Sequence, residues 1–192
     1  MLFKDFCVIL QLKFLTDYMH IIMMKSFLLL FALISITLSL PAQDKKQKKI
    51  EGKNLTKKVL GRVDSVFFTT EEARRVGDQV LMFQRITGGW PKNVDMVTPL
   101  TDETREKGLR KKKKTDDSTI DNRATTMQMK YLARLFRATK DDRYSESFNK
   151  GLEFLLAGQY DNGGWPQFWP NPQGYQVHIT YNDGAMINTL NL

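Results

Sequence analysis

The stretch Gln84-Arg-Ile-Thr-Gly-Gly-Trp-Pro91 returns 75 residues later as Gln159-Tyr-Asp-Asn-Gly-Gly-Trp-Pro166. Both copies read Gln-x-x-x-Gly-Gly-Trp-Pro, and each follows a stretch with helical apolar periodicity. Paired glycines permit the positive φ that ends a helix, and the proline prevents the helix from resuming. A repeated unit of helix and turn is typical of helical hairpins stacked around an axis. The repeat therefore predicts an all-α fold, an α/α toroid built from helical hairpins.

Apolar residues at helical spacing predict three helices around this repeat. The first begins at Thr69, which offers a capping box with Glu72, and runs to about Gln84. The second begins within residues 119–121 and has the longest apolar stripe. The third follows the polar turn 140–143, and such a short link predicts an antiparallel helical hairpin.

The chain is basic, with a formal net charge of +8 over 192 residues. A positive surface favours polyanions, either nucleic acid or acidic polysaccharide. No basic and aromatic stripe typical of nucleic-acid recognition is present in the sequence, so we expect an acidic polysaccharide and no nucleic acid. The charged stretch 99–117 lacks apolar periodicity and is predicted to be a surface loop. Its basic cluster, 110–114, is either simply solvated or contacts such a polymer.

Residues 1–42 are predicted to be a leader. From Met24 to Ala42 the sequence has one lysine, an apolar run of about a dozen residues and a small residue at its end, which is the pattern of a signal peptide. The run is shorter than the roughly 20 residues of a membrane-spanning helix, so no stable membrane anchor is expected. Residues 1–23 form an upstream extension, and they hold the single cysteine, Cys7. We expect a secreted or periplasmic protein without disulfides.

The lysine-rich residues 43–58 are predicted to be a charged linker, because they offer too little apolar surface to offset the entropy of ordering. The folded part is therefore expected at residues 59–192. In a secreted chain without disulfides, its stability depends on a buried core, with a bound metal as a further contribution.

Polar clusters mark the predicted helix ends at Trp90 to Asn93, at Asp121 and Asn122, and at Asn182 and Asp183. In a toroid, turns on the same side converge on one mouth, so the second and third clusters are expected to be neighbours. Carboxylate and amide oxygens suit calcium, whereas zinc prefers cysteine and histidine. The alternative is that these residues only cap helices.

Trp90 and Trp165 close the two copies of the repeat. Each tryptophan either stacks on a sugar ring or fills the gap between neighbouring hairpins, and the sequence leaves both roles open. Terpenoid cyclases and protein prenyltransferases also use Gln-to-Gly-x-Trp repeats on α/α toroids. The repeat alone therefore leaves that class open as well.

Four longer segments narrow the choice: QRITGGWPKNVDM, KKTDDSTIDNRATTMQMKYLARLF, YSESFNKGLEFLLAGQYDNGGWPQFWP and GYQVHITYNDGAMINTL. In this order they resemble the family 10 polysaccharide lyases, which are pectate lyases, over about residues 60–192. The resemblance implies an incomplete α/α toroid, with residues 59–192 as a truncated amino-terminal part of the catalytic domain. It also implies β-elimination on polygalacturonate with Ca²⁺, which gives 4,5-unsaturated oligogalacturonides.

The resemblance assigns roles to individual residues. Asp121 and Asn122 of TIDN and Asp183 of ITYND correspond to calcium ligands, and the first two also to substrate contacts. Lys92 is expected to pair with a galacturonate carboxylate, with Trp90 and Trp165 as further candidate substrate contacts.

The family's Brønsted base is an arginine, expected beyond Leu192, so this chain is expected to be inactive as it stands. Arg123 does not correspond to that base. A monomer is expected. The alternative is a non-catalytic toroid that binds acidic polysaccharide.

Overall fold

The computed structural model describes residues 19–20, 22–28 and 43–192, except for the side chain of Asp183. The chain divides into two units, Met1–Lys48 and Lys49–Leu192. In the first unit, residues 22–28 and 43–48 are helical. Most of the predicted leader, Cys7 included, lies outside the described residues. Within the described ranges, no helix has the length and apolar character that a membrane span requires.

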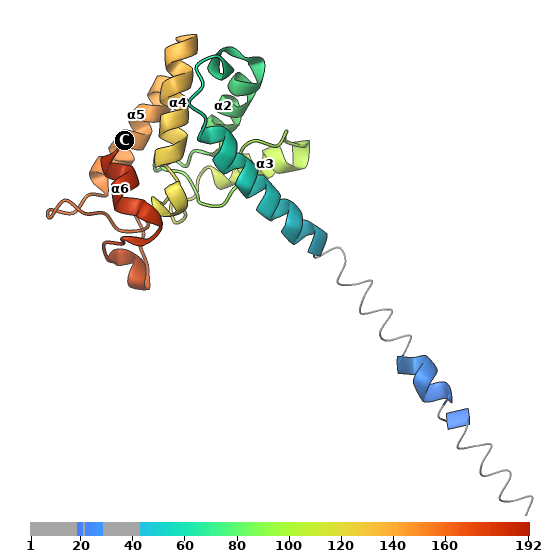
Figure 1. Cartoon of the computed structure of the whole chain (residues 1–192). Helices are drawn as coiled ribbons and strands as arrows, with labels where there is room; N and C mark the ends of the chain where they lie inside the picture. The colour runs from blue at the N-terminus through green and yellow to red at the C-terminus, as the bar shows by residue number, and fades with distance from the viewer. Residues whose placement is uncertain (1–18, 21, 29–42) are drawn as a thin grey trace, which may run out of the picture. The chain divides into compact units, whose positions relative to one another are not determined.

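The second unit, Lys49–Leu192, is helical (Figure 1). Its described residues form isolated β-bridges but no strand, which confirms the predicted all-α class. After a helix at residues 49–60, the elements in order are η1 (Phe67–Thr69), α2 (Glu71–Phe83), α3 (Asp102–Lys111), η2 (Asp121–Arg123), α4 (Thr126–Thr139), α5 (Asp142–Ala157), η3 (Gly174–Val177), η4 (Asn182–Gly184) and α6 (Ala185–Leu190).

Helices α4 and α5 form the predicted hairpin, and α2 packs against both. Lys140 joins the hairpin in the left-handed conformation, and its backbone N–H donates to the carbonyl of Phe136 at 2.8 Å. The apolar stripes predicted from the sequence supply most of the core. Its fully or almost fully buried members include Ala73, Val76, Val80, Tyr131, Leu132, Leu135 and Tyr144.

Helix α2 begins one residue later than predicted. Thr70, not Thr69, is the N-cap, and its hydroxyl accepts a hydrogen bond from the backbone N–H of Ala73. Thr69 belongs to η1, where the buried rings of Phe67 and Phe68 pack against Tyr131. These aromatic contacts hold the preceding turn and shift the start of the helix.

Helix α4 begins at Thr126, not within 119–121. The intervening residues form η2 and an irregular turn, with positive φ at Asn122, Arg123 and Thr125. Positive φ is incompatible with a continuous right-handed helix. Ile120 and Ala124 are nevertheless buried, so the apolar pattern located the core side correctly while misplacing the helix start.

Residues 102–111 form helix α3 where a surface loop was predicted. Thr101 caps it by accepting from the N–H of Thr104, with acidic residues in the first turn and basic residues in the last, as the helix dipole favours. Only Gly108 is buried, against Met82 of α2. Contact through a single glycine leaves no apolar stripe in the sequence, which explains the wrong prediction.

The predicted linker is also helical. Residues 49–60 form a helix whose Thr56, Val59 and Leu60 are buried in the second unit. The Thr56 hydroxyl accepts a hydrogen bond of 2.9 Å from the backbone N–H of Met96. A hydroxyl and two apolar residues are enough to dock this helix, although lysines dominate its composition.

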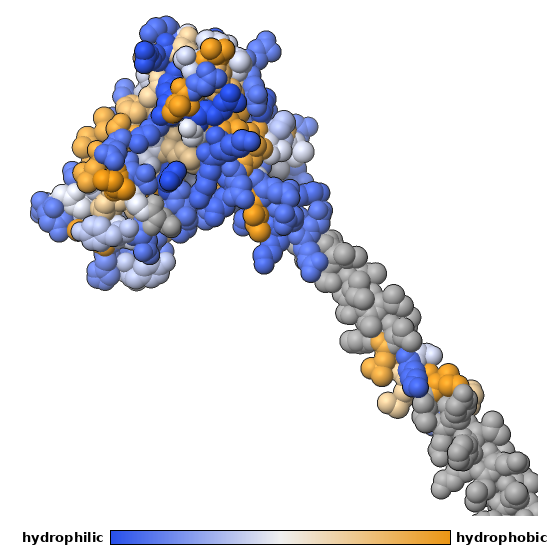
Figure 2. Space-filling model, in the orientation of Figure 1, coloured by the Kyte–Doolittle hydropathy of each residue, from blue (hydrophilic) through white to orange (hydrophobic). Residues whose placement is uncertain are grey.

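Helices α5 and α6 expose apolar side chains. Figure 2 shows apolar residues gathered on the flank of the folded unit where Figure 1 places these helices. Leu152 and Leu156 had been predicted to lie on the buried side of α5, but they are 38% and 62% exposed. Ile187 and Leu190 of α6 are exposed as well. These apolar side chains recur at helical spacing, but no described element covers them.

Candidate functional site

The two copies of the repeat have the same internal hydrogen bonds. Gln84 Nε2 donates to the carbonyl of Gly88 at 2.7 Å, and Gln159 Nε2 donates to that of Gly163 at 3.0 Å. Both of these glycines have positive φ, 91° and 83°. The turn is therefore built by the glutamine and the first glycine of each copy.

Both tryptophans of the repeat point into the protein. Trp90 is fully buried and its Nε1 donates to the carbonyl of Val80 at 2.8 Å. Trp165 is 8% exposed, and its Nε1 donates to the carbonyl of Leu155 at the same distance. In both cases the acceptor lies ten residues earlier, on the preceding helix. Their burial favours the role of filling the space between hairpins over that of stacking on a sugar.

The segment before α4 is fixed between the two copies. Thr119 N donates to the carbonyl of Trp90, and the Thr119 hydroxyl donates to that of Gln167 at 2.5 Å. The Thr125 hydroxyl donates to the carbonyl of Thr119 and accepts from the N–H of Trp90. Two threonines thus hold both ends of a short, irregular segment that contains Asp121 and Asn122.

Backbone strain is concentrated in this segment. Asn122, Arg123 and Thr125 all have positive φ, between 54° and 65°, and Asn93 beside them has φ 60°. Such conformations cost about 1–3 kcal/mol each and cluster at functional sites. The strain, together with the surrounding polar residues, marks this segment as the candidate site.

The predicted convergence of the polar clusters is visible in the backbone. Turn η2, which contains Asp121 and Asn122, packs directly against η4, which contains Asn182 and Asp183. The side chain of Asp183 lies outside the description, so its direction is not assigned. The structure therefore brings the two predicted motifs together at the level of their backbones.

Lys92 and Asp121, both predicted site residues, form an ion pair. The Asp121 side chain is 5% exposed and that of Lys92 is 31% exposed. A buried carboxylate is tolerable only when a partner compensates its charge. The Lys92 Nζ also lies 5.1 Å from the centroid of the Phe168 ring, at a cation–π distance. Arg123, in contrast, is exposed, as expected for a residue without an assigned role.

The donor chemistry at η2 fits a hard cation. Asp121 and Asn122 offer carboxylate and amide oxygens, which calcium prefers. Among the described residues, no three His, Cys, Asp or Glu side chains lie close enough together to hold a metal by themselves. Calcium takes six to eight oxygens, so oxygens from a ligand or from water would have to complete its shell.

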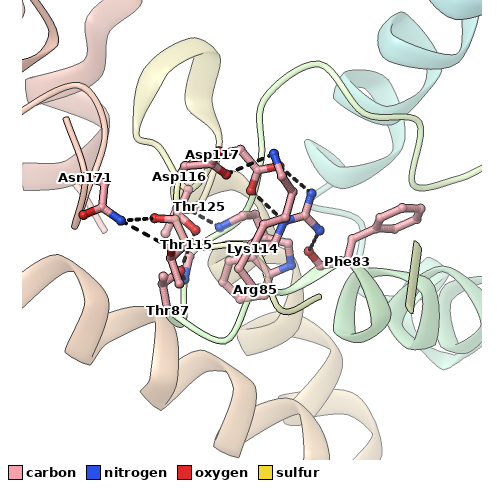
Figure 3. A network of polar contacts seen from close by, with 12 residues as sticks. Phe83, Arg85, Thr87, Lys114, Thr115, Asp116, Asp117, Thr125 and Asn171 are labelled. Atoms are coloured by element: carbon pink, nitrogen blue, oxygen red, sulfur yellow. Dashed lines mark hydrogen bonds and ion pairs between the residues drawn. The ribbon is translucent and has the colours of Figure 1, made fainter. Parts of the chain in front are cut away.

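A buried arginine, Arg85, stabilises the segment that leads into η2. The sequence analysis did not identify this residue. Arg85 Nε and Nη2 donate to the two carboxylate oxygens of Asp117 at 2.7 and 2.9 Å, and Nη1 donates to the carbonyl of Phe83 (Figure 3). Lys114 pairs with Asp116 at 3.0 Å. Arg85 thus connects the first repeat copy to the segment that precedes η2. Lys114 belongs to the same network.

Two further residues near the site were not singled out as ligands. Phe168 lies against Lys92, and Asn93 has a buried side-chain oxygen that finds no hydrogen-bond partner in the described part of the chain. The signal for Asn93 was its type, because asparagine tolerates positive φ better than other non-glycine residues. The sequence did not indicate Phe168, because an aromatic residue shortly after Trp-Pro is equally typical of a core position.

Comparison with known proteins places the chain in a family. The model of the pectic acid lyase family matches residues 84–192, more than half of the chain, and the chain belongs to that family. Terpenoid cyclases and prenyltransferases are thereby set aside.

Two solved structures resemble the chain. A family 10 polysaccharide lyase from Cellvibrio cellulosa is 34% identical with a TM-score of 0.52, and the match covers 62% of this chain and 34% of that chain. A mutant of a family 10 lyase from the same organism, in complex with trigalacturonic acid, is 32% identical with the same TM-score and coverage. The likeness confirms the predicted incomplete α/α toroid. The chain spans about a third of the length of these lyases, and no curated protein matches it.

Proposed function

We propose that this chain is the part of a calcium-dependent pectate lyase that binds acidic sugar and cation, and that the protein cleaves polygalacturonate by β-elimination. The observation that carries the proposal is the packing of η2 against η4, which brings the TIDN and ITYND motifs together in a member of the pectic acid lyase family. A related lyase was solved with trigalacturonic acid, which supports a galacturonate substrate.

The reaction needs positive charge at the sugar carboxylate. A base removes the C5 proton, the electron pair forms the C4=C5 double bond, and the C4–O bond breaks as the leaving oxygen acquires a proton. Negative charge develops beside a carboxylate that is already negative. Bound calcium would neutralise that charge, as electrostatic stabilisation does in oxyanion sites.

Within this chain, each site residue receives a defined task. Asp121 and Asn122 would hold the cation, with Asp183 from the adjacent η4. Lys92 compensates the Asp121 carboxylate in the free protein, and a galacturonate carboxylate would compete for the same ammonium group. Trp90 and Trp165 position the two turns from within the core. The arginine that acts as the base is expected beyond Leu192, by the resemblance to the family 10 lyases.

The cellular context is part of the proposal. We propose export to the periplasm or the medium through the segment Met24 to Ala42, with the protein acting as a monomer and without nucleic acid. Export is supported by the signal-peptide pattern of that segment and by the nature of the substrate, a polymer too large to be met inside a cell.

A non-catalytic toroid that binds acidic polysaccharide is the second candidate, and the basic charge of the chain favours binding in either case. The two candidates are separated by expressing the protein from Gln43 through an extended reading frame. Absorbance of the unsaturated product is then followed on polygalacturonate, with calcium or a chelator. Growth of absorbance with calcium alone supports the lyase, and retention on polygalacturonate gels without cleavage supports the binding toroid.

A further inference from the structure

A small cavity opens beside the candidate site. Its volume is about 20 Å³, enough for one water molecule or one small polar group of a ligand. The helix 49–60 contributes one wall of the cavity, and the segment after Trp90, turn η2 and the first turn of α4 contribute the rest. Its polar lining consists of Lys53, Thr56, Lys57, Lys92, Asn93, Asn122 and Gln128.

Lys92 and Asn122 connect this cavity to the candidate site, since both border the cavity and both belong to the predicted substrate contacts. Two of its asparagines, Asn93 and Asn122, are the ones with positive φ. The strained backbone of the site is therefore the same backbone that forms the cavity wall.

The cavity carries unused hydrogen-bonding capacity. The side-chain oxygens of Asn93 and Gln128 are buried, and neither accepts a hydrogen bond from any described residue. Gln128 is 2% exposed. A buried polar atom without a partner costs about 1–3 kcal/mol. Two such acceptors in one cavity call for a donor, which a water molecule supplies in the free protein and a ligand hydroxyl can replace.

The cavity is also cationic. Lys53 is half-buried and Lys57 is exposed, and neither forms an ion pair with another described residue. The nearby carboxylate of Asp95 is engaged by the N–H groups of Val97 and Thr98, and that of Asp121 is paired with Lys92. Hydrogen bonds do not neutralise Asp95, but this one carboxylate does not line the cavity and is outnumbered by the two lysines, so the net charge at the cavity is positive.

We propose that the mouth of this cavity is an additional uronate subsite, in which Lys53 and Lys57 bind a sugar carboxylate and a single hydroxyl of the sugar enters the cavity to donate to the amide oxygen of Asn93 or Gln128. A uronate carries both kinds of group, whereas a neutral sugar lacks the charge. The family match begins at Gln84, so the two lysines lie outside the matched region. This inference rests on the proposed function, because it assigns one more unit of the same polymer.

The test compares two double variants of the chain. Lys53→Ala/Lys57→Ala removes two charges from the cavity, and Lys49→Ala/Lys58→Ala removes two charges from exposed positions of the same helix that do not line it. Hexagalacturonate binding is measured by calorimetry with calcium at fixed salt, after equal thermal unfolding midpoints have been verified. Lys57→Ala alone, at an exposed position, repeats the test with the least effect on folding.

We expect roughly five- to tenfold weaker binding for the cavity variant, about threefold for Lys57→Ala, and less than twofold for the control. The two double variants should bind a methyl-esterified hexamer equally well, because the ester removes the carboxylate charge that Lys53 and Lys57 are proposed to bind. Equal losses in both, or no loss in either while the parent chain binds, would overturn the subsite and leave the proposed function intact. Absence of binding by the parent chain would overturn both.

Discussion

The two copies of the repeat share their internal hydrogen bonds but not their surroundings. The glutamine of the first copy, Gln84, is buried: its amide also donates to the carbonyl of Ser147 on α5 and accepts from the Ser147 hydroxyl. The glutamine of the second copy, Gln159, is exposed, and among the described residues its side chain makes only the hydrogen bond within the turn. The turn is therefore specified locally by its own sequence, whereas its burial depends on the neighbouring hairpin.

The first glycine of each copy gives the sharpest form of this contrast. A Cβ on Gly88 would lie 2.2 Å from the backbone carbonyl oxygen of Lys150 on α5, whereas a Cβ on Gly163 would meet nothing within 4 Å. Gly88→Ala is expected to lower the free energy of unfolding by about 3–5 kcal/mol, through positive φ and the backbone clash together. Gly163→Ala should cost only the conformational part, about 1–2 kcal/mol.

Urea denaturation of the two glycine variants measures this difference directly. The second-copy variant serves as the matched control, because both glycines have positive φ and occupy the same place in the turn. Equal losses of stability would show that the approach of α5 is not close enough to matter, and would remove the basis for the contrast.

The glutamines are expected to show the next largest effect. Gln84→Ala leaves the carbonyls of Gly88 and Ser147 without their donor in a buried place, and should destabilise the protein by about 2–3 kcal/mol. Gln159→Ala, at an exposed position, should cost about 0.5 kcal/mol. Thermal or urea unfolding of both variants tests the pair. If Gln159→Ala lowered the free energy of unfolding as much as Gln84→Ala, burial would not be the reason for the difference between the two glutamines.

The smallest expected effect on stability concerns a residue that follows the first copy and has no counterpart after the second. The chain after the first copy reaches Asp95, and the equivalent place after the second is Pro170. Burial opposes ionisation of Asp95, but hydrogen bonds from Thr98, Val97 and Thr56 outweigh it and lower its pKa below the ordinary 3.8. A lowered pKa in the folded state stabilises the protein above pH 3.8, and this contribution is lost as the pH falls through the folded-state value.

Asp95→Asn should therefore reduce stability at pH 6 by about 0.5 kcal/mol, because solvent screens a carboxylate that is only partly buried. The difference between parent and variant should shrink towards pH 3. Unfolding curves at pH 6, 4 and 3 give the comparison. A difference that grows as the pH falls would mean that the pKa is raised, opposite to the assignment.

The repeat and most positions of the apolar stripes of α2, α4 and α5 could be predicted, because side chains buried along one helix face recur at helical spacing. Leu152 and Leu156 of α5 are the exceptions. The burial of Val76 and Val80 follows from that pattern. Helix α3 and the helix 49–60 could not be predicted, because each docks through a few small or polar residues, such as Gly108 and Thr56, within a charged sequence.

The candidate site divides in the same way. Asp121 and Asn122 were identified by residue type and by resemblance, and their proximity to η4 followed from toroid geometry. The pairing of Lys92 with Asp121 was not predicted, because it depends on how the first turn closes over η2. The burial of both tryptophans likewise depends on neighbours that a short motif does not specify.

Asp121 is proposed to help hold a cation that is shared with an acidic sugar. Calorimetric titration of calcium into the chain with trigalacturonate present tests this role, for the parent, for Asp121→Asn and for the exposed control Asp161→Asn. Calcium is expected to bind the parent and the control, and to bind Asp121→Asn about tenfold or more weakly, because a charged oxygen ligand is lost. Equal calcium affinity in Asp121→Asn and the parent would contradict it.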